Sequence, residues 1–546
     1  MEQLYRILGV HIPEILLPAK GTDLTKWSVI ACDQYTSQPE YWKKVNEEVG
    51  DSPSTLRLTF PEIYLKDDDK DERISNINEA MLQYLNQGIL EPQKPGFILV
   101  DRSTPHAASR KGLILAVDLE CYDYRAGSQA LIRATEGTVL DRIPPRVKIR
   151  ENAPIELPHI MVLIDDPGKT VIESLFERTY SFEKLYDFEL MQGGGHIRGW
   201  KVDDAGSLSL TANALAKLTG LENTEDAANT QEDRSKAGGY HRGIYKNPLE
   251  ATLCKAPLLF AMGDGNHSLA SAKAHWENVK AALKLHDSAN RLQDQAAGIT
   301  EPVIEIIEPA AGVKGTDAGL QTPDPGIQHT RDTAAVPEHP ARYALVEVVN
   351  VHDEGLVFEP IHRVLFGIDS RTILEAMKNI CSRISNGNSK AEYKLYSSRA
   401  AMDSDMKSAR DAVAATFRHN TSAGDASHSA PVFPHNPPHL LPFILEGIYG
   451  LLSISNPSGS LEAGTLQSIL DELGKCDPDV EIDYIHGEQV IAELGSQKNH
   501  MGLYLPSMNK YDFFKIVKRE GILPRKTFSL GEAEEKRYYL ECRCIR

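Results

Sequence analysis

The sequence lacks the features of a membrane or secreted protein. No apolar run reaches the roughly 18 residues that a membrane-spanning helix needs. The segment that begins at Met1 has no positively charged stretch followed by an apolar core, which is the pattern of a secretory signal peptide. We therefore expect a soluble, cytoplasmic protein with no membrane partner.

Paired cysteines and an excess of positive charge are also missing. The seven cysteines are scattered and contain no Cys-x-x-Cys pair, so we expect neither a disulfide framework nor a cysteine zinc site. Lys and Arg number 59 against 77 Asp and Glu, which gives a net charge of -18. Proteins that bind nucleic acids generally present a basic surface, so we expect no nucleic-acid partner. The oligomeric state stays open.

The remaining composition is that of an ordinary globular protein, with 41% hydrophobic and 25% charged residues. Periodicity predicts helices over residues 71–85, 372–383 and 461–473, and strands over residues 97–100, 112–117 and 160–164. We expect residues 343–349 and 356–366 to be two strands that pair as a hairpin. Because no long strand–helix–strand series is present, we expect an α+β fold of mixed sheets with flanking helices.

Three polar segments interrupt this pattern and are poor core builders. They cover residues 222–246, 310–340 and 418–442. We interpret them as mobile insertions, because loops of this length are unusual inside a compact domain. The first separates an N-terminal α/β region (1–221) from a signature region (247–366). The second lies inside that signature region, and the third lies inside a C-terminal α/β region (367–546).

The most informative stretch predicts a strand, a glycine turn and a helix. Residues 256–262 are apolar, and the turn that follows has the sequence Gly263-Asp264-Gly265-Asn266-His267-Ser268. Gly263 and Gly265 can take positive φ, and Asn266 or Ser268 can cap the helix. The first N–H groups of a helix and its dipole favour a phosphate. The alternative is an ordinary strand–helix connection with glycines for tight packing.

This turn resembles the signature of the domain of unknown function 1015 (DUF1015) family, in its Asp-Gly-Asn-His-Ser version. Residues 131–150, 156–159 and 164–166 resemble the N-terminal half of that family, and Glu359-Pro-Ile-His-Arg363 resembles its Pro-x-His-Arg element. The resemblance implies no assigned activity. The turn is more distantly similar to that of ParB/sulfiredoxin-type free-serine kinases, where it holds nucleotide phosphates. In that comparison Ser268 stands where those kinases have Arg.

A basic segment is the second candidate for chemistry. Between residues 131 and 151, five cations stand against three acids, Glu136, Asp141 and Glu151. The cations are Arg133, Arg142, Arg146, Lys148 and Arg150. An extended conformation after the two prolines would line the last three on one face, where arginines suit phosphate or carboxylate groups. The alternative is a solvated strand edge.

Three further positions could reach a ligand. His362 and Arg363 follow an apolar strand and a proline, at a predicted strand end, although such a dipeptide is often only a surface pair. Asp33 follows a short apolar strand and matches an acidic position of the family, where it could act as a base or a Mg²⁺ ligand. Lys526 matches a lysine of the family and could contact an anion, the alternative being a surface lysine.

These residues favour a nucleotide-dependent phosphotransferase that acts on a small hydroxylated metabolite, with ATP or ADP and Mg²⁺ as cofactors. Asp264, His267 and Asp33 are the predicted catalytic residues, and Asp264 is also the predicted Mg²⁺ ligand. The predicted ligand-binding residues are Gly263, Gly265, Asn266, Ser268, Arg133, Glu136, Arg142, Arg146, Arg150, His362, Arg363 and Lys526. The alternative is a non-catalytic sensor that binds a nucleotide or another small anionic metabolite, or a protein that binds a partner.

Overall fold

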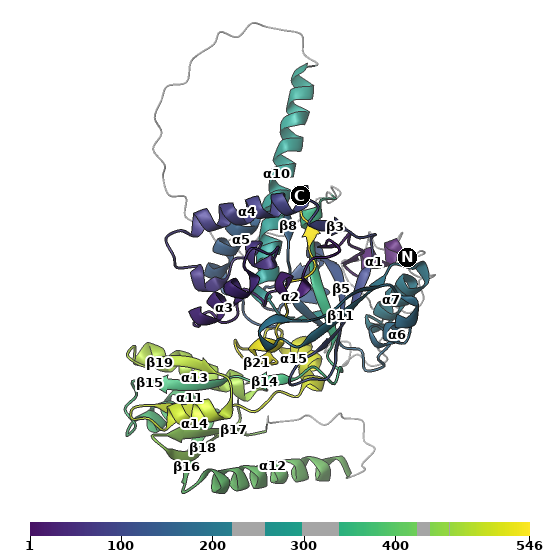
Figure 1. Cartoon of the computed structure of the whole chain (residues 1–546). Coiled ribbons are helices and arrows are strands. Elements are labelled where there is room, and N and C mark those ends of the chain that lie inside the picture. Colours follow the sequence, from purple (N-terminus) through teal and green to yellow (C-terminus); the bar gives the residue numbers. More distant parts are fainter. Residues whose placement is uncertain (221–256, 298–337, 423–436, 458) are drawn as a thin grey trace.

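The structure is a computed structural model that describes residues 1–220, 257–297, 338–422, 437–457 and 459–546. In Figure 1 a large sheet with its helices occupies the upper part, and a smaller sheet with its own helices lies below it. Two short strands, β14 and β21, and helix α15 lie between the two. In the part of the chain that the structure describes, no helix is long and apolar enough to cross a membrane.

The large sheet has ten strands in the order β10-β11-β4-β5-β13-β9-β12-β7-β6, and β1 also pairs with β5. Its strands are β1 (Val10–His11), β4 (Phe97–Ser103), β5 (Arg110–Asp118), β6 (Tyr122–Asp123), β7 (Ile132–Arg133), β9 (Met161–Ile164), β10 (Lys184–Glu189), β11 (His196–Val202), β12 (Phe260–Asp264) and β13 (Tyr343–Asn350). The pairs β13–β9, β12–β7 and β6–β7 are parallel and the other pairs are antiparallel. The sheet is therefore mixed.

Helices cover both faces of this sheet. On one face Leu115 and Val346 pack with α1 (Glu2–Ile7), α7 (Ala205–Leu218) and α10 (Asn266–Ala297). On the other face Ile114 and Leu345 pack with α2 (Leu24–Trp27), α3 (Pro39–Val49) and α4 (Lys70–Asn86). Burial on both sides explains why β5 and β13 are almost continuously apolar instead of alternating.

The lower sheet has six antiparallel strands in the order β16-β18-β17-β20-β15-β19. They are β15 (His362–Phe366), β16 (Lys390–Tyr396), β17 (His439–Leu445), β18 (Ile448–Ser455), β19 (Glu481–Ile485) and β20 (Met501–Leu503). Leu365 faces α11 (Ile373–Ile384) and α13 (Glu462–Cys476). Its neighbour Val364 faces α14 (Glu488–Gly495), and α12 (Arg399–Ser422) packs on Leu440 and Leu451.

Short elements complete the fold. The pairs are β2 (Leu16–Pro18) with β3 (Leu90–Pro92), β8 (Ile155–Glu156) with β22 (Arg543–Cys544), and β14 (Phe358–Pro360) with β21 (Phe528–Leu530). The remaining helices are α5 (Ile143–Glu151), α6 (Glu173–Phe176) and α15 (Phe513–Glu520). The last residues of the chain run back along the large sheet, where Tyr538 bridges to Ile30 and Cys542 to Leu16.

The predicted α+β class is confirmed, as are the six individual helices and strands named from periodicity. The predicted hairpin is wrong. Residues 343–349 belong to β13, which pairs with β5 on one side and β9 on the other, so both of its edges are occupied. Residues 356–366 are divided at Ile361 into β14 and β15, which belong to two different sheets.

The predicted extended conformation of the basic segment is also wrong, because Arg146, Lys148 and Arg150 lie in helix α5. Pro144 and Pro145 fall in its first turn, where the missing N–H groups would have no partner inside the helix and the fixed φ fits helical geometry. Arg146 and Arg150 therefore share a face of the helix and Lys148 does not.

The predicted insertions lie largely outside the described residues. Residues 222–246 and 310–337 are not described, nor are residues 423–436 of the third segment. The end of that third segment is not an insertion, however, because His439 and the three residues after it are buried in β17. The apolar run that starts at Leu440 continues to Leu445 and contains Pro442, and the prolines at and before this position resemble those of a loop.

Candidate functional site

The predicted signature turn joins β12 to α10. The pairing of β12 with β9 shifts register between Met262 and Asp264, so Gly263 forms a bulge that redirects the chain before the helix. Gly265 has φ +80, as predicted, whereas Gly263 does not have positive φ. A side chain at Gly263 would instead meet Leu530 at 2.7 Å. Glycine is therefore needed at this position because β21 approaches it closely.

The polar side chains of the turn hold neighbouring segments in place. Asp264 Oδ2 lies 3.1 Å from Lys536 Nζ, and its Oδ1 accepts the Gly265 N–H at 2.9 Å. Asn266 Oδ1 accepts the Thr135 N–H at 3.3 Å. We expected Asn266 or Ser268 to cap the helix, but α10 begins at Asn266 itself and these side chains contact other segments. The first N–H groups of α10, which have no partners inside the helix, are thus left for another acceptor.

His267 lies in a basic environment. Its Nε2 accepts the Val139 N–H at 3.2 Å, so the neutral ring carries its proton on Nδ1. Burial, together with the smaller effects of the charges on Arg146, Arg142, Arg525 and Lys526, lowers the pKa of His267 to about 4. His267 is therefore neutral at pH 7, and four cations surround the start of α10.

Asp33 and Ser268 meet at His159. Ser268 Oγ is 3.1 Å from His159 Nε2, and Asp33 Oδ2 is 3.8 Å from the same nitrogen. His159 Nδ1 is 2.8 Å from the hydroxyl of Tyr539, which also accepts the Cys32 N–H at 3.2 Å. When the Tyr539 hydroxyl donates to Nδ1, the proton of His159 is on Nε2 and is donated to Ser268. In that arrangement His159 orients Ser268 and does not deprotonate it.

Glu136 is the group of the cluster that titrates near neutral pH. Burial raises the pKa of its carboxyl to about 7, and the negative charge of Asp264 acts in the same direction. Lys526 and Lys536 oppose this shift. Glu136 is still partly exposed, so a ligand could reach its carboxyl. A carboxyl with this pKa can accept a proton from a substrate and release it again at physiological pH.

Arg363 holds the basic residues of the C-terminal loop in position. Its guanidinium is buried and donates to the carbonyl oxygens of Arg525 at 3.2 Å and Lys526 at 3.0 Å. It also lies over the ring of Tyr484 at 4.4 Å. Lys526 itself is exposed and has φ +56. Arg363 thus contributes to the site by positioning this loop.

The opposite rim of the site is the start of α5. Arg142 is exposed, and Arg146 forms an ion pair with Glu62 and donates to the Arg142 carbonyl oxygen at 2.9 Å. Together with the loop of Lys526 these side chains surround the N-terminus of α10. We refer below to the site formed by Asp264, Lys536, Glu136, His267, Ser268, His159, Asp33, Arg142, Arg146, Arg525 and Lys526 as the signature cluster.

Three predicted site residues lie apart from this cluster. Arg133 donates to the Ala130 carbonyl oxygen at 2.7 Å. Arg150 pairs with Glu156, which also binds Arg543 at 2.8 Å in a buried network at the C-terminal end of the chain. His362 lines a cavity of the lower sheet instead, because it and Arg363 are consecutive strand residues whose side chains point to opposite faces.

Sequence analysis missed Lys536 and Arg525. Lys536 is buried and binds Asp264, yet it lies far along the chain in a charged segment without a helix or strand pattern. Arg525 precedes Lys526, which was the residue that the family resemblance indicated. His159 lies in residues 156–159, which carried part of the resemblance, but nothing in the sequence indicated its contact with Ser268.

The predicted Mg²⁺ ligand, Asp264, already contacts two groups of the protein. Both oxygens of Asp264 are engaged, one by Lys536 and one by the Gly265 N–H. Lys536 supplies the positive charge that a metal ion would supply. Within the described residues, no group of three or more His, Cys, Asp or Glu side chains could hold a metal ion.

Comparison with known proteins gives a family but no activity. Residues 16–298 and 326–453 match the family described as Protein of unknown function (DUF1015). No curated protein matches the chain. A solved structure, a conserved hypothetical protein from Pyrococcus furiosus, is 15% identical with a TM-score of 0.21. The match covers 36% of this chain and 62% of the other, so this chain spans about three-fifths of its length.

Proposed function

The chain belongs to the DUF1015 family of proteins of unknown function, and we propose that it is a phosphotransferase that moves a phosphoryl group from a nucleotide to a hydroxyl of a small metabolite. The observation that carries this proposal is the carboxyl of Glu136, whose pKa burial raises to about 7, beside a helix N-terminus surrounded by cations. The likeness of the turn to that of ParB/sulfiredoxin-type kinases remains a prediction.

The helix N-terminus and the cations form the phosphate-binding part of the site. The first N–H groups of α10 and the helix dipole favour negative charge. Arg142 and Arg146 stand on one side and Arg525 and Lys526 on the other, all close enough to lower the pKa of His267. Arginine side chains donate in pairs to phosphate oxygens, and the Nδ1–H of His267 is a further donor. We propose that ATP or ADP places its phosphates here.

Glu136 acts on the acceptor hydroxyl. As the oxygen of the metabolite bonds to phosphorus, its proton passes to the Glu136 carboxylate and the bond from phosphorus to the nucleotide breaks. Lys526 and the arginines neutralise the charge on the transferred group. General base catalysis of this kind contributes roughly 100-fold to 10,000-fold. Asp264 keeps Lys536 in place and its charge helps to keep the pKa of Glu136 near 7. No step of this scheme requires a metal ion on Asp264.

The test is nucleotide consumption by Glu136→Gln. With a pool of small alcohols and hydroxylated metabolites, wild-type protein should consume ATP or ADP, and the variant should be at least about a hundredfold slower. Its nucleotide affinity should be almost unchanged, because Glu136 accepts a proton and makes no phosphate contact. Glu151→Gln is the matched control, since Glu151 is exposed at the end of α5.

The pH dependence of turnover gives a second readout. The ascending limb of the profile should have its midpoint near pH 7. Asp264→Asn removes a charge that raises the pKa of Glu136 and leaves Lys536 unpaired, and both effects lower that pKa. The limb should therefore move to lower pH in this variant. A profile that does not move would show that Glu136 is not the base.

The second candidate is a non-catalytic sensor of the same anionic ligand. It is favoured by the arrangement of His159, which orients Ser268 without activating it when Tyr539 donates to its Nδ1, and by the contacts that already engage both oxygens of Asp264. If no metabolite pool supports nucleotide consumption and a nucleotide still raises the melting temperature, the protein is a sensor. Either function is proposed for a cytoplasmic protein without a nucleic-acid partner, in keeping with its net charge of -18.

A further inference from the structure

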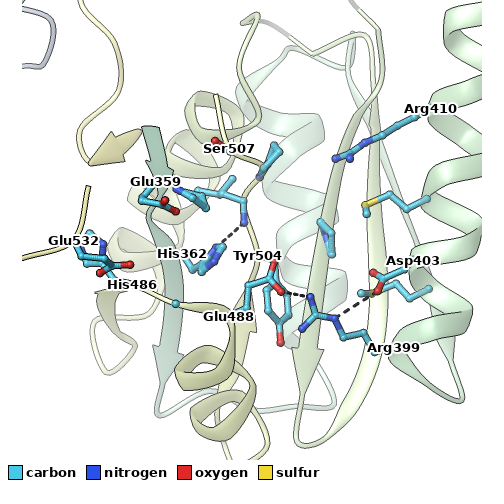
Figure 2. Close-up of a pocket in the computed structure, with 17 residues that line it drawn as sticks. Glu359, His362, Arg399, Asp403, Arg410, His486, Glu488, Tyr504, Ser507 and Glu532 are labelled. Atoms are coloured by element: carbon cyan, nitrogen blue, oxygen red, sulfur yellow. Dashed lines mark hydrogen bonds and ion pairs between the residues drawn. The ribbon is translucent and has the colours of Figure 1, made fainter. Parts of the chain in front are cut away.

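A cavity in the lower part of the molecule has no role in the proposed reaction. It has a volume of about 560 Å³ and lies between α12, the start of α14 and the strands β15 and β17. This volume is within the range of small-molecule sites, about 300–1,000 Å³. No residue of the signature turn lines it. Figure 2 shows Glu359 and Glu532 on one side and Arg410 on the other, with His362 between them and Glu488 beside Arg399.

Helix α12 forms one wall of the cavity, and Arg410 on this wall has no counter-ion among the described residues. Arg399, Met402, Met406 and Arg410 follow helical spacing, so they share the face that lines the cavity. Arg399 is neutralised, because it pairs with Glu488 of α14 and lies 3.5 Å from a carboxylate oxygen of its own helix. Arg410 forms no ion pair or side-chain hydrogen bond with any described residue, and Figure 2 shows it extending from α12 towards the cavity.

The other end of the cavity is acidic. Glu359 at β14 and Glu532 both line it, and Figure 2 shows them on the side away from Arg410. Burial raises the pKa of Glu532, and the charge of Glu359 raises it further. One function of the Glu532 side chain is to accept the N–H of Glu535 in a capping box. Glu359 has no ion pair among the residues that the structure describes, so this end has negative charge that a bound cation would stabilise.

Between these ends the cavity is lined by apolar side chains, by neutral polar groups such as Tyr504 and by the ion pair of Glu488 with Arg399. Met402, Met406 and Leu505 supply apolar surface. His362 Nδ1 accepts the Leu505 N–H at 3.1 Å, so the neutral ring keeps its proton on Nε2. Burial lowers the pKa of His362 to about 4, and the ring is uncharged at pH 7. Since Glu488 and Arg399 neutralise each other and His362 is uncharged, a ligand that fits has an uncharged middle.

We propose that this cavity binds a small zwitterion with a flexible apolar chain, whose ammonium group lies between Glu359 and Glu532 and whose acidic group pairs with Arg410. The chain of the ligand packs along Met402 and Met406, and the flexible thioethers adapt to it. The proposal assigns a second ligand site to the protein, and it does not depend on the phosphotransferase activity.

The probes are straight-chain ω-amino carboxylates from 4-aminobutanoate to 8-aminooctanoate, titrated into the full chain by calorimetry. The controls are alkylamines and alkyl carboxylates of the same lengths, each of which has one charged end. One length should bind at least about tenfold tighter than either one-ended control, because only the zwitterion makes a charge-assisted hydrogen bond at both ends. If no length binds more tightly than its one-ended controls, the proposal is wrong.

Two variants locate the ends of the ligand. Glu359→Gln should weaken the zwitterion and the alkylamine about tenfold and leave the alkyl carboxylate unchanged. Arg410→Met should weaken the zwitterion and the alkyl carboxylate and leave the alkylamine unchanged. Lys407→Met is the control, since Lys407 is exposed on the same helix and does not line the cavity. Equal affinity for the zwitterion in wild type and both variants would place the ligand elsewhere and overturn the proposal.

The same titration separates this site from the signature cluster. Glu136→Gln should bind the zwitterion like wild type, whether or not it consumes nucleotide. Melting temperatures of all variants establish that each is folded. If Glu136→Gln instead removes zwitterion binding, the ligand occupies the signature cluster and the proposed second site is wrong.

Discussion

Asp264 and Lys536 form an ion pair, 3.1 Å between Oδ2 and Nζ, that joins the signature turn to the C-terminal segment. Lys536 is buried and also donates to Ser529 Oγ at 2.9 Å. The pair places the charge of Lys536 beside the N-terminus of α10. It also lowers the pKa of Asp264 against the effect of burial, so this carboxylate stays ionised beside Glu136.

Breaking this ion pair should destabilise the protein. Asp264→Asn leaves the buried ammonium of Lys536 without its counter-ion, at a cost of about 1–3 kcal/mol in the free energy of unfolding. Lys536→Met leaves the carboxylate unpaired at a similar cost. Urea denaturation of the single and double variants should give a coupling energy of about 0.5–3 kcal/mol. Strictly additive losses would show that the two side chains do not interact in solution.

Glu136 should make the protein less stable as pH rises. Its folded pKa, about 7, is above its unfolded value, so the folded state binds the proton more tightly and loses stability between about pH 4.3 and 7. Glu136→Gln removes this loss. The variant should match wild type near pH 4.5 and exceed it by about 1–3 kcal/mol at pH 8, measured by urea denaturation. A variant less stable than wild type at pH 8 would contradict the raised pKa.

The arginines at the start of α5 and within it should differ in role: some bind the ligand and one stabilises the fold. Arg142→Ala or Arg146→Ala should weaken the best nucleotide or other anionic ligand by about 1.5–3 kcal/mol. Arg150→Ala is the comparison, because Arg150 pairs with the buried Glu156 and lies outside the signature cluster. It should lower the melting temperature and leave ligand affinity unchanged. If all three variants bind the ligand as tightly as wild type, Arg142 and Arg146 do not contact the ligand.

The segment from residue 310 to 337 should be replaceable. It is the part of the second predicted insertion that precedes the described residues beginning at Glu338. If the segment is a mobile insertion, as its sequence predicts, a short Gly/Ser linker in its place should leave the melting midpoint nearly unchanged, because each doubling of a flexible loop costs only about 0.6 kcal/mol. The control is a linker of the original length. Loss of folded protein with the short linker alone would show that the segment is packed.

Local sequence was enough for much of the fold. The helix at Lys70–Asn86 and the strand at Arg110–Asp118 follow from spacing of apolar residues, which depends only on near neighbours. The helix after the turn and the positive φ of Gly265 follow from the turn sequence in the same way, although neither Asn266 nor Ser268 caps the helix as predicted. The helix at Ile143–Glu151 was not predicted. Its basic residues at every second position also fit a strand, whereas the two prolines at its start are typical of a helix N-terminus.

The sequence by itself determined the fold class, the family resemblance and the turn that precedes α10, because these depend on residues that are close together in the chain. Only the tertiary structure decided which distant groups meet there. Lys536 reaches Asp264 and Tyr539 reaches His159 because the last residues of the chain return to the large sheet. The raised pKa of Glu136 has the same origin, since burial and the charge of Asp264 act on it only after the chain has folded.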